Sequence, residues 1–128
     1  MKAALLLSVL CASCASTPHP VVPLPATAET VVVTYLPKAG QDAALQQEIA
    51  ATWSEMLRLR LTANDEHHFY RAEDDNSRPY FVEIFSWKDA ETPDHVPPAI
   101  EAHWKKFSDL VEPRGERPGL QIAVVKRL

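Results

Sequence analysis

Apolar residues fill both faces of the segment 29–36, ETVVVTYL. Alternate residues of a strand point to opposite sides of a sheet, and β-branched and aromatic residues favour that conformation. Because both sets of side chains here are largely apolar, the pattern predicts a strand covered on both faces. Pro37 and Gly40 follow it and end the strand.

From Gln41 onward the spacing changes to that of an amphipathic helix. Apolar residues recur at intervals of four, four and three, at Leu45, Ile49, Trp53 and Met56. This spacing places them on one helical face, and Asp42 suits the positive end of the helix dipole. The pattern predicts a helix that ends near Arg60 or Leu61.

Two further strands are predicted around a short polar loop. Residues 67–72, HHFYRA, and 80–87, YFVEIFSW, have strand-like composition, and the loop 74–79 between them is rich in turn-forming residues. The loop length indicates a hairpin.

The C-terminal third predicts one more helix and one more strand. Pro97 and Pro98 suit a first helical turn, and an apolar stripe follows at Ile100, Trp104, Phe107 and Val111. After Gly115 and Gly119, residues 120–128, LQIAVVKRL, are typical of a last strand.

The resulting order is β-α-β-β-α-β, a ferredoxin-like α+β unit. Two helices cover one face of such a sheet, whereas three of the predicted strands are apolar on both faces. We therefore expect a homodimer in which a second copy of the chain covers the other face.

The N-terminal residues are typical of a secretion signal. Lys2 precedes an apolar run that is too short to span a membrane permanently, and small residues follow. Residues 10–14, LCASC, resemble the bacterial lipobox, in which cleavage occurs just before a cysteine that carries the lipid. We expect a signal peptide at residues 1–13 and lipidation at Cys14; plain cleavage nearby is the alternative.

Residues 14–28 form a proline-rich tether, and the folded domain occupies residues 29–128. Proline favours extended geometry, so the tether would lift the domain off a membrane surface. Ala15 is not the aspartate that signals inner-membrane retention. The resemblance therefore implies a cell-envelope lipoprotein, lipid-anchored in the outer membrane and facing the periplasm.

Composition excludes several classes of partner. The formal net charge of −4 argues against nucleic acid, whose phosphates require a basic surface. Three glycines and no phosphate-binding loop argue against nucleotide cofactors. No metal-ligand spacing is present, and His67 and His68, as strand neighbours, point to opposite faces.

The domain resembles the antibiotic-biosynthesis monooxygenase (ABM) family of the dimeric α+β barrel superfamily. The likeness lies in VVVTYLPKAGQDAALQQEI, in HHFYRAEDDNSRPYFVEIFSWKDAE and in the helix IEAHWKKF, and it covers residues 29–128. It implies an oxygenase that needs no cofactor and acts on a small aromatic or apolar ligand. Trp87 matches a tryptophan of the active members, and His95 lies near a histidine of haem-degrading members.

The strand 80–87 carries the main candidate site. Phe81, Glu83, Phe85 and Trp87 share one side of it. Trp87 either caps the core or dimer seam or walls a cavity for a flat ligand, with Phe85 beside it. Glu83 is either a buried general base, since burial disfavours its charged form, or a solvated or arginine-paired residue near an open edge.

Three further side chains are open to more than one interpretation. His95 is a candidate proton acceptor or an exposed loop residue. Tyr70 and Tyr35 are each candidates to contact a phenolic substrate, or belong to the core or an interface. The sequence does not separate these possibilities.

Three functions follow from this pattern: a cofactor-free monooxygenase, a small-ligand-binding module without chemistry, and a structural envelope protein. A cavity would distinguish the first two from the third, and turnover would distinguish the first from the second.

Overall fold

The computed structural model describes residues 23–128. The predicted signal peptide, Cys14 and most of the tether lie outside the described residues. The domain consists of β1 (Glu29–Tyr35), α1 (Asp42–Arg58), β2 (His68–Glu73), β3 (Pro79–Trp87), the short 3-10 helix η1 (Thr92–His95), α2 (Pro98–Leu110) and β4 (Leu120–Val125). The predicted β-α-β-β-α-β order is confirmed, with bounds within about three residues of those expected and η1 added.

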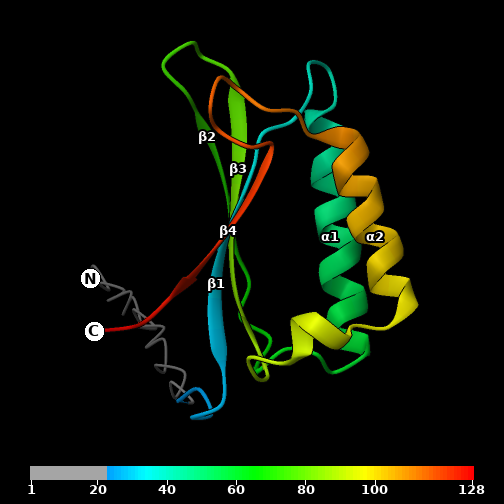
Figure 1. Ribbon diagram of the computed structural model, residues 1–128, viewed down its shortest axis with the longest axis vertical. Helices are drawn as coiled ribbons and strands as arrows, with labels where there is room; N and C mark the ends of the chain where they lie inside the picture. The colour runs from blue at the N-terminus through cyan, green and yellow to red at the C-terminus, as the bar shows by residue number, and fades with distance from the viewer. Residues whose placement is uncertain (1–22) are drawn as a thin grey trace, which may run out of the picture.

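The four strands form one antiparallel sheet in the order β2-β3-β1-β4. Val33 of β1 lies between Glu83 of β3 and Ile122 of β4, and Phe69 of β2 pairs with Glu83 on its other side. Residues paired in this way point to the same face. Figure 1 shows the sheet nearly edge-on, with both helices on one side of it.

Helix α1 buries a stripe that differs by one residue from the predicted one. Leu45, Ile49 and Met56 are buried as expected, but Thr52 takes the third place in the stripe instead of Trp53. The Thr52 hydroxyl donates a hydrogen bond to the Glu48 carbonyl, which satisfies it inside the helix. Trp53 is only partly buried and lies at the margin of the core.

Helix α2 begins at Pro98. Proline has no N–H group, but an N–H in the first turn of a helix has no intrahelical acceptor, so no hydrogen bond is lost there. Its buried residues are Ile100 and Phe107, with Trp104 partly buried between them. Val111 was predicted in the helical stripe, but it follows the last helical residue and forms an isolated bridge with Pro37. The helix ends there because the chain turns back toward β1.

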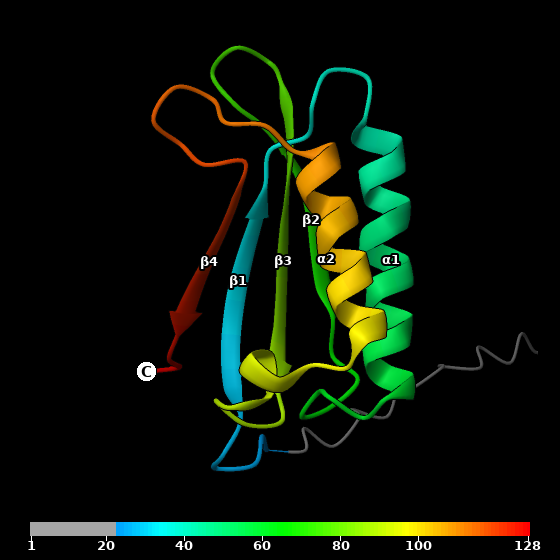
Figure 2. The same cartoon turned by 45° about the vertical axis from the view of Figure 1, so that its right-hand side comes forward.

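The helices leave β4 largely uncovered. Ile122 and Val124 point to the helical side of the sheet, yet they are 61% and 59% exposed. Figure 2 shows β4 at the edge of the sheet farthest from the helix pair. On the opposite face, Val32, Val82 and Ile84 are half-buried within the chain and have no helix over them. Apolar surface is therefore left on the helical side of β4 and on the opposite face of β1 and β3.

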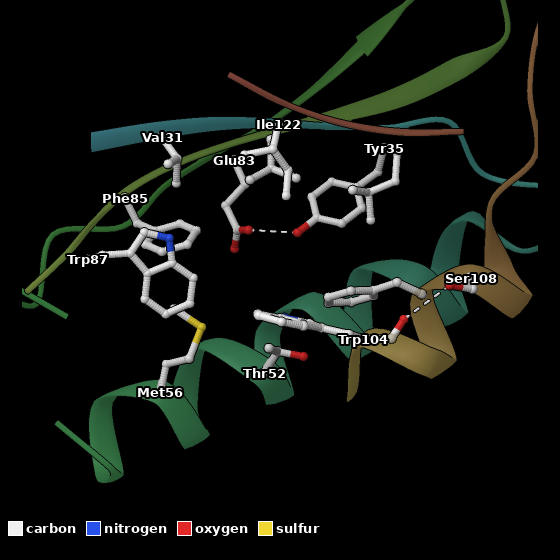
Figure 3. Close-up of a pocket in the computed structure, with 13 residues that line it drawn as sticks. Val31, Tyr35, Thr52, Met56, Glu83, Phe85, Trp87, Trp104, Ser108 and Ile122 are labelled. Atoms are coloured by element: carbon white, nitrogen blue, oxygen red, sulfur yellow. Dashed lines mark hydrogen bonds between the residues drawn. The ribbon is translucent and has the colours of Figure 1, made fainter. Parts of the chain in front are cut away.

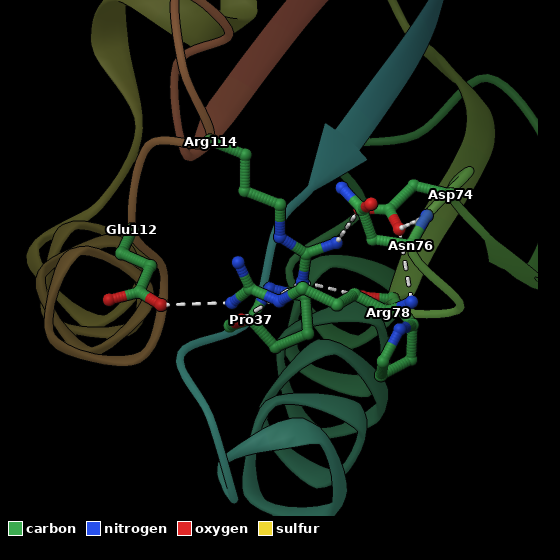
Figure 4. Close-up of polar contacts among 7 residues, drawn as sticks. Pro37, Asp74, Asn76, Arg78, Glu112 and Arg114 are labelled. Carbon is green, nitrogen blue, oxygen red and sulfur yellow. Dashed lines mark hydrogen bonds and ion pairs between the residues drawn. The ribbon is translucent and has the colours of Figure 1, made fainter.

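A buried arginine joins three loops at one end of the sheet. Arg114, whose side chain is 8% exposed, donates to the Asp74 carboxylate at 3.1 Å and to the carbonyl oxygens of Pro37 and Pro79 at 3.1 and 2.7 Å (Figure 4). Asp74 also accepts the backbone N–H groups of Arg78 and Asn76. These bonds and the Arg114 guanidinium lower the pKa of the Asp74 carboxyl, with the Arg78 N–H contributing most. The cluster ties the β2–β3 hairpin to the α2–β4 connection.

Candidate functional site

A pocket of about 290 Å³ lies between the sheet and the two helices. Its walls come from β1, β3 and β4 on one side and from α1 and α2 on the other (Figure 3). The lining residues are Val31, Val33, Tyr35, Thr52, Met56, Glu83, Phe85, Trp87, Trp104, Phe107, Ser108, Leu120 and Ile122. Five are aromatic, and one carries a charge, so the pocket is suited to a small apolar molecule.

The mouth of the pocket faces the uncovered strand β4. Ser108 on α2 and Ile122 on β4 both line the pocket and are both exposed. The inner residues, among them Trp87 and Phe107, are buried. A ligand can therefore enter between β4 and α2.

Aromatic rings form the inner wall. Trp87 contacts Phe85 edge-on at 5.0 Å between ring centroids, and Trp104 at 6.4 Å. Phe107 meets Tyr35 edge-on at 5.2 Å. Edge-to-face packing fixes ring orientation, so the walls are formed before a ligand arrives. Trp87 is buried in the core and also lines the cavity; its contact with a flat ligand stays a prediction.

Glu83 is the charged residue of the pocket. It is 5% exposed, although a carboxylate is costly to bury without partners. Two partners are present: the Tyr35 hydroxyl donates to Oε1 at 2.8 Å, and Nε2 of His67 lies 2.6 Å from Oε2. The interpretation of Glu83 as a solvated or arginine-paired residue is wrong. It is buried and held by a phenol and an imidazole.

Tyr35 remains a hydrogen-bond donor over a wide pH range. Burial raises the pKa of its phenol well above the ordinary value of 10.0, and the charge of Glu83 and the hydrogen bond to it raise the pKa further. A neutral phenol can donate to the carboxylate but cannot neutralise it. Glu83 therefore keeps lone pairs available to accept a proton from a bound molecule.

His67 completes the group from just outside β2. Its ring stacks on Trp53 with a centroid distance of 4.3 Å and an angle of 11°. Sequence reasoning considered His67 only as a possible metal ligand and did not connect it with Glu83. The missing signal was the β2–β3 register, which pairs Phe69 with Glu83. His67 lies two residues before Phe69 and so reaches the carboxylate from the same side of the chain.

Two predicted site residues lie outside the pocket. Tyr70 is 55% exposed and points to the face of the sheet opposite the helices. His95 is exposed at the end of η1 and does not line the pocket. Glu83, Phe85 and Trp87 do line it, and Tyr35, whose place the sequence left open, joins them. Among residues 23–128 no three potential metal-binding side chains come together.

The fold is that of ferredoxin-like α+β proteins related in structure to antibiotic-biosynthesis monooxygenases. SnoaB, a cofactor-independent oxygenase from Streptomyces nogalater, superposes with a TM-score of 0.60 at 17% identity, over 80% of this chain and 95% of that one. A candidate antibiotic biosynthesis monooxygenase from Bordetella bronchiseptica gives a TM-score of 0.50 at 14% identity, over 80% and 98% of the two chains.

A third structure, Rv0793 from Mycobacterium tuberculosis, gives a TM-score of 0.57 at 14% identity, over 79% of this chain and 95% of that one. No family model matches the sequence, and no curated protein sequence matches it. The predicted resemblance is thus confirmed for the fold.

Proposed function

We propose that this domain binds a small, flat, largely apolar molecule and oxidises it with molecular oxygen, without a cofactor. The observation that supports this most directly is the buried Glu83 carboxylate at an aromatic-walled pocket, with a lone pair free to accept a proton. A base in such an apolar site is well placed to ionise a weakly acidic ligand.

The chemistry needs one base and dioxygen. Glu83 removes a proton from a CH₂ group that is activated by adjacent aromatic rings, and the ligand keeps the electron pair. The carbanion then reacts with dioxygen. The carbon becomes a carbonyl group that holds one oxygen atom, and the other oxygen atom leaves as water. Trp87 and Phe85 orient the rings of the ligand during these steps.

Oxygen uptake tests the proposal. The mature protein is mixed with anthrone, whose CH₂ group lies between two rings. Dioxygen consumption is followed together with formation of anthraquinone, in which that CH₂ has become a second carbonyl group. Uptake above the spontaneous rate supports an oxygenase. Saturable binding of anthrone without uptake supports the alternative, a ligand-binding module without chemistry.

The uncovered sheet face supports a homodimer. Val32, Val82 and Ile84 form an apolar patch with no helix over it, and a second copy of this chain would cover it. Native mass spectrometry of the protein purified from its host tests this assembly and also detects a co-purified ligand. Ile84→Glu should convert the dimer to a monomer, whereas Gln46→Glu, on the exposed side of α1, should not.

We place this domain in the cell envelope, as a lipoprotein anchored through Cys14 to the outer membrane and facing the periplasm. The basis is the sequence LCASC and the proline-rich tether. In residues 23–128 neither helix is long and apolar enough to cross a membrane.

A further inference from the structure

His67 connects the pocket carboxylate with the surface of the domain. Its Nε2 atom lies 2.6 Å from Oε2 of Glu83, and its side chain is 15% exposed whereas that of Glu83 is 7% exposed. The imidazole therefore contacts the buried carboxylate on one side and can exchange protons with water on the other.

The ring is fixed independently of any ligand. Trp53 of α1 stacks on one face, and Phe69 of β2 lies parallel to the ring at 6.0 Å and 6°. These contacts orient Nε2 toward Glu83 without help from the pocket contents. His67 is therefore held against Glu83 whether or not the pocket contains a ligand.

The surroundings of His67 contain few charges that could substitute for it. Glu83 faces it from β3, with the neutral Tyr35 of β1 behind the carboxylate. The contacts from α1 and β2 are the uncharged Trp53 and Phe69. In its own loop, Asp65 and Glu66 are exposed acids. Among residues 23–128 no lysine or arginine lines the pocket, and the basic side chain in contact with Glu83 is His67.

We propose that His67 is a positioning residue that sets the charge of the pocket and thereby the strength with which Glu83 accepts a hydrogen bond or a proton from the ligand. This inference rests on the proposed role of Glu83. A neutral His67 donates its Nε2–H to Oε2 and leaves the carboxylate uncompensated. A protonated His67 forms an ion pair with it, and the pocket as a whole becomes neutral.

The two states differ in their affinity for a ligand with an O–H group. A hydrogen bond to a carboxylate is stronger when no cation shares that carboxylate in a low-dielectric site. A ligand donor thus binds more tightly to the state with neutral His67. By linkage, binding of such a ligand must favour the neutral histidine by the same factor.

The test compares 1-naphthol, which has a hydroxyl donor, with naphthalene, which has the same rings and no donor. Affinities are measured over a series of pH values, and protonation of the His67 ring is followed by NMR in the same protein. We expect the affinity for 1-naphthol to rise about fivefold or more as His67 loses its proton. Saturating 1-naphthol should displace the His67 titration curve to lower pH by the logarithm of this affinity ratio. Naphthalene should leave the curve in place.

His67→Gln supplies an amide N–H in place of Nε2–H but does not titrate. This variant should therefore lose the pH-dependent change in 1-naphthol affinity that accompanies deprotonation of His67. His68→Gln is the matched control, because His68 points to the opposite face and should keep that change. A His67 titration curve that 1-naphthol leaves unchanged overturns the proposal, even if His67→Gln does not fold. If 1-naphthol binding is coupled to His67 protonation but anthrone causes no oxygen uptake, the oxygenase proposal fails and the role of His67 stands. If oxygen uptake occurs without that coupling, the oxygenase proposal stands and the role of His67 fails.

Discussion

Tyr35 and Glu83 lie diagonally across two neighbouring strands, and the phenol donates a 2.8 Å hydrogen bond to the carboxylate inside the core. The β1–β3 register produces this contact, because Val33 pairs with Glu83 and Tyr35 pairs with Phe81 two residues earlier. Both side chains therefore point to the helical face. A carboxylate buried among aromatic side chains is unfavourable unless it accepts hydrogen bonds, and the Tyr35 phenol supplies one of them.

Tyr35→Phe should lower stability at neutral pH and weaken its dependence on alkaline pH. The loss of one buried hydrogen bond costs about 1 kcal/mol. Because the folded pKa of Tyr35 lies above the unfolded value of 10.0, the folded state retains a proton that the unfolded state releases. Wild-type stability therefore falls as the pH rises above that value toward the folded pKa. Urea denaturation at several alkaline pH values should show a steeper fall for the wild type than for the variant.

Glu83→Gln should abolish turnover while leaving the pocket in place. The amide has nearly the same volume, and its oxygen can accept the Tyr35 hydrogen bond, but it cannot take up a proton. We expect oxygen uptake with anthrone to fall roughly 10²- to 10⁴-fold, with binding of naphthalene unchanged. Glu73→Gln, at the exposed end of β2, serves as the control. Full uptake by Glu83→Gln would show that another group is the base.

Sequence patterns predicted the elements and the β3 part of the candidate site, for a definite physical reason. Alternation along β3 places Glu83, Phe85 and Trp87 on one face, and that relation is local. Whether Phe69 or Tyr70 of β2 shares the face depends on pairing between strands, and both residues are aromatic. The sequence therefore could not exclude Tyr70 or link His67 to Glu83. The pocket itself needs α1 and α2 placed over the sheet, which no short stretch of sequence encodes.

Ser108→Leu should obstruct the pocket without unfolding the domain. Ser108 is exposed at the mouth, and its hydroxyl donates to the carbonyl of Trp104 in its own helix. A leucine there would project into the entrance. We expect roughly tenfold weaker binding of 1-naphthol, or about 1.4 kcal/mol, measured by titration calorimetry. Lys105→Leu, on the exposed side of α2, should bind normally; equal losses in both variants would place the binding site elsewhere.

Arg114→Met should destabilise the domain without a direct effect on the pocket. The substitution retains much of the aliphatic volume but removes the guanidinium bonds to Oδ2 of Asp74 and to the carbonyl oxygens of Pro37 and Pro79. Loss of buried bonds from a charged group should cost about 2–4 kcal/mol, measured by urea denaturation. Arg58→Met removes an exposed pair with Glu55 on one helix and should change stability little. A similar small effect of Arg114→Met would show that the three loops hold together without it.

Cys14→Ser tests the membrane anchor separately from the pocket. If the lipid is attached to Cys14, serine removes the acceptor sulfur, so the variant should stay unprocessed and lose the mature lipidated form. Cys11→Ser is the matched control, since it changes the neighbouring cysteine of the same LCASC segment and should leave processing intact. Labelling with a radioactive fatty acid, together with membrane fractionation, follows both properties. Normal labelling of Cys14→Ser would exclude Cys14 as the anchor, whereas loss of labelling in Cys11→Ser alone would assign the lipid to Cys11.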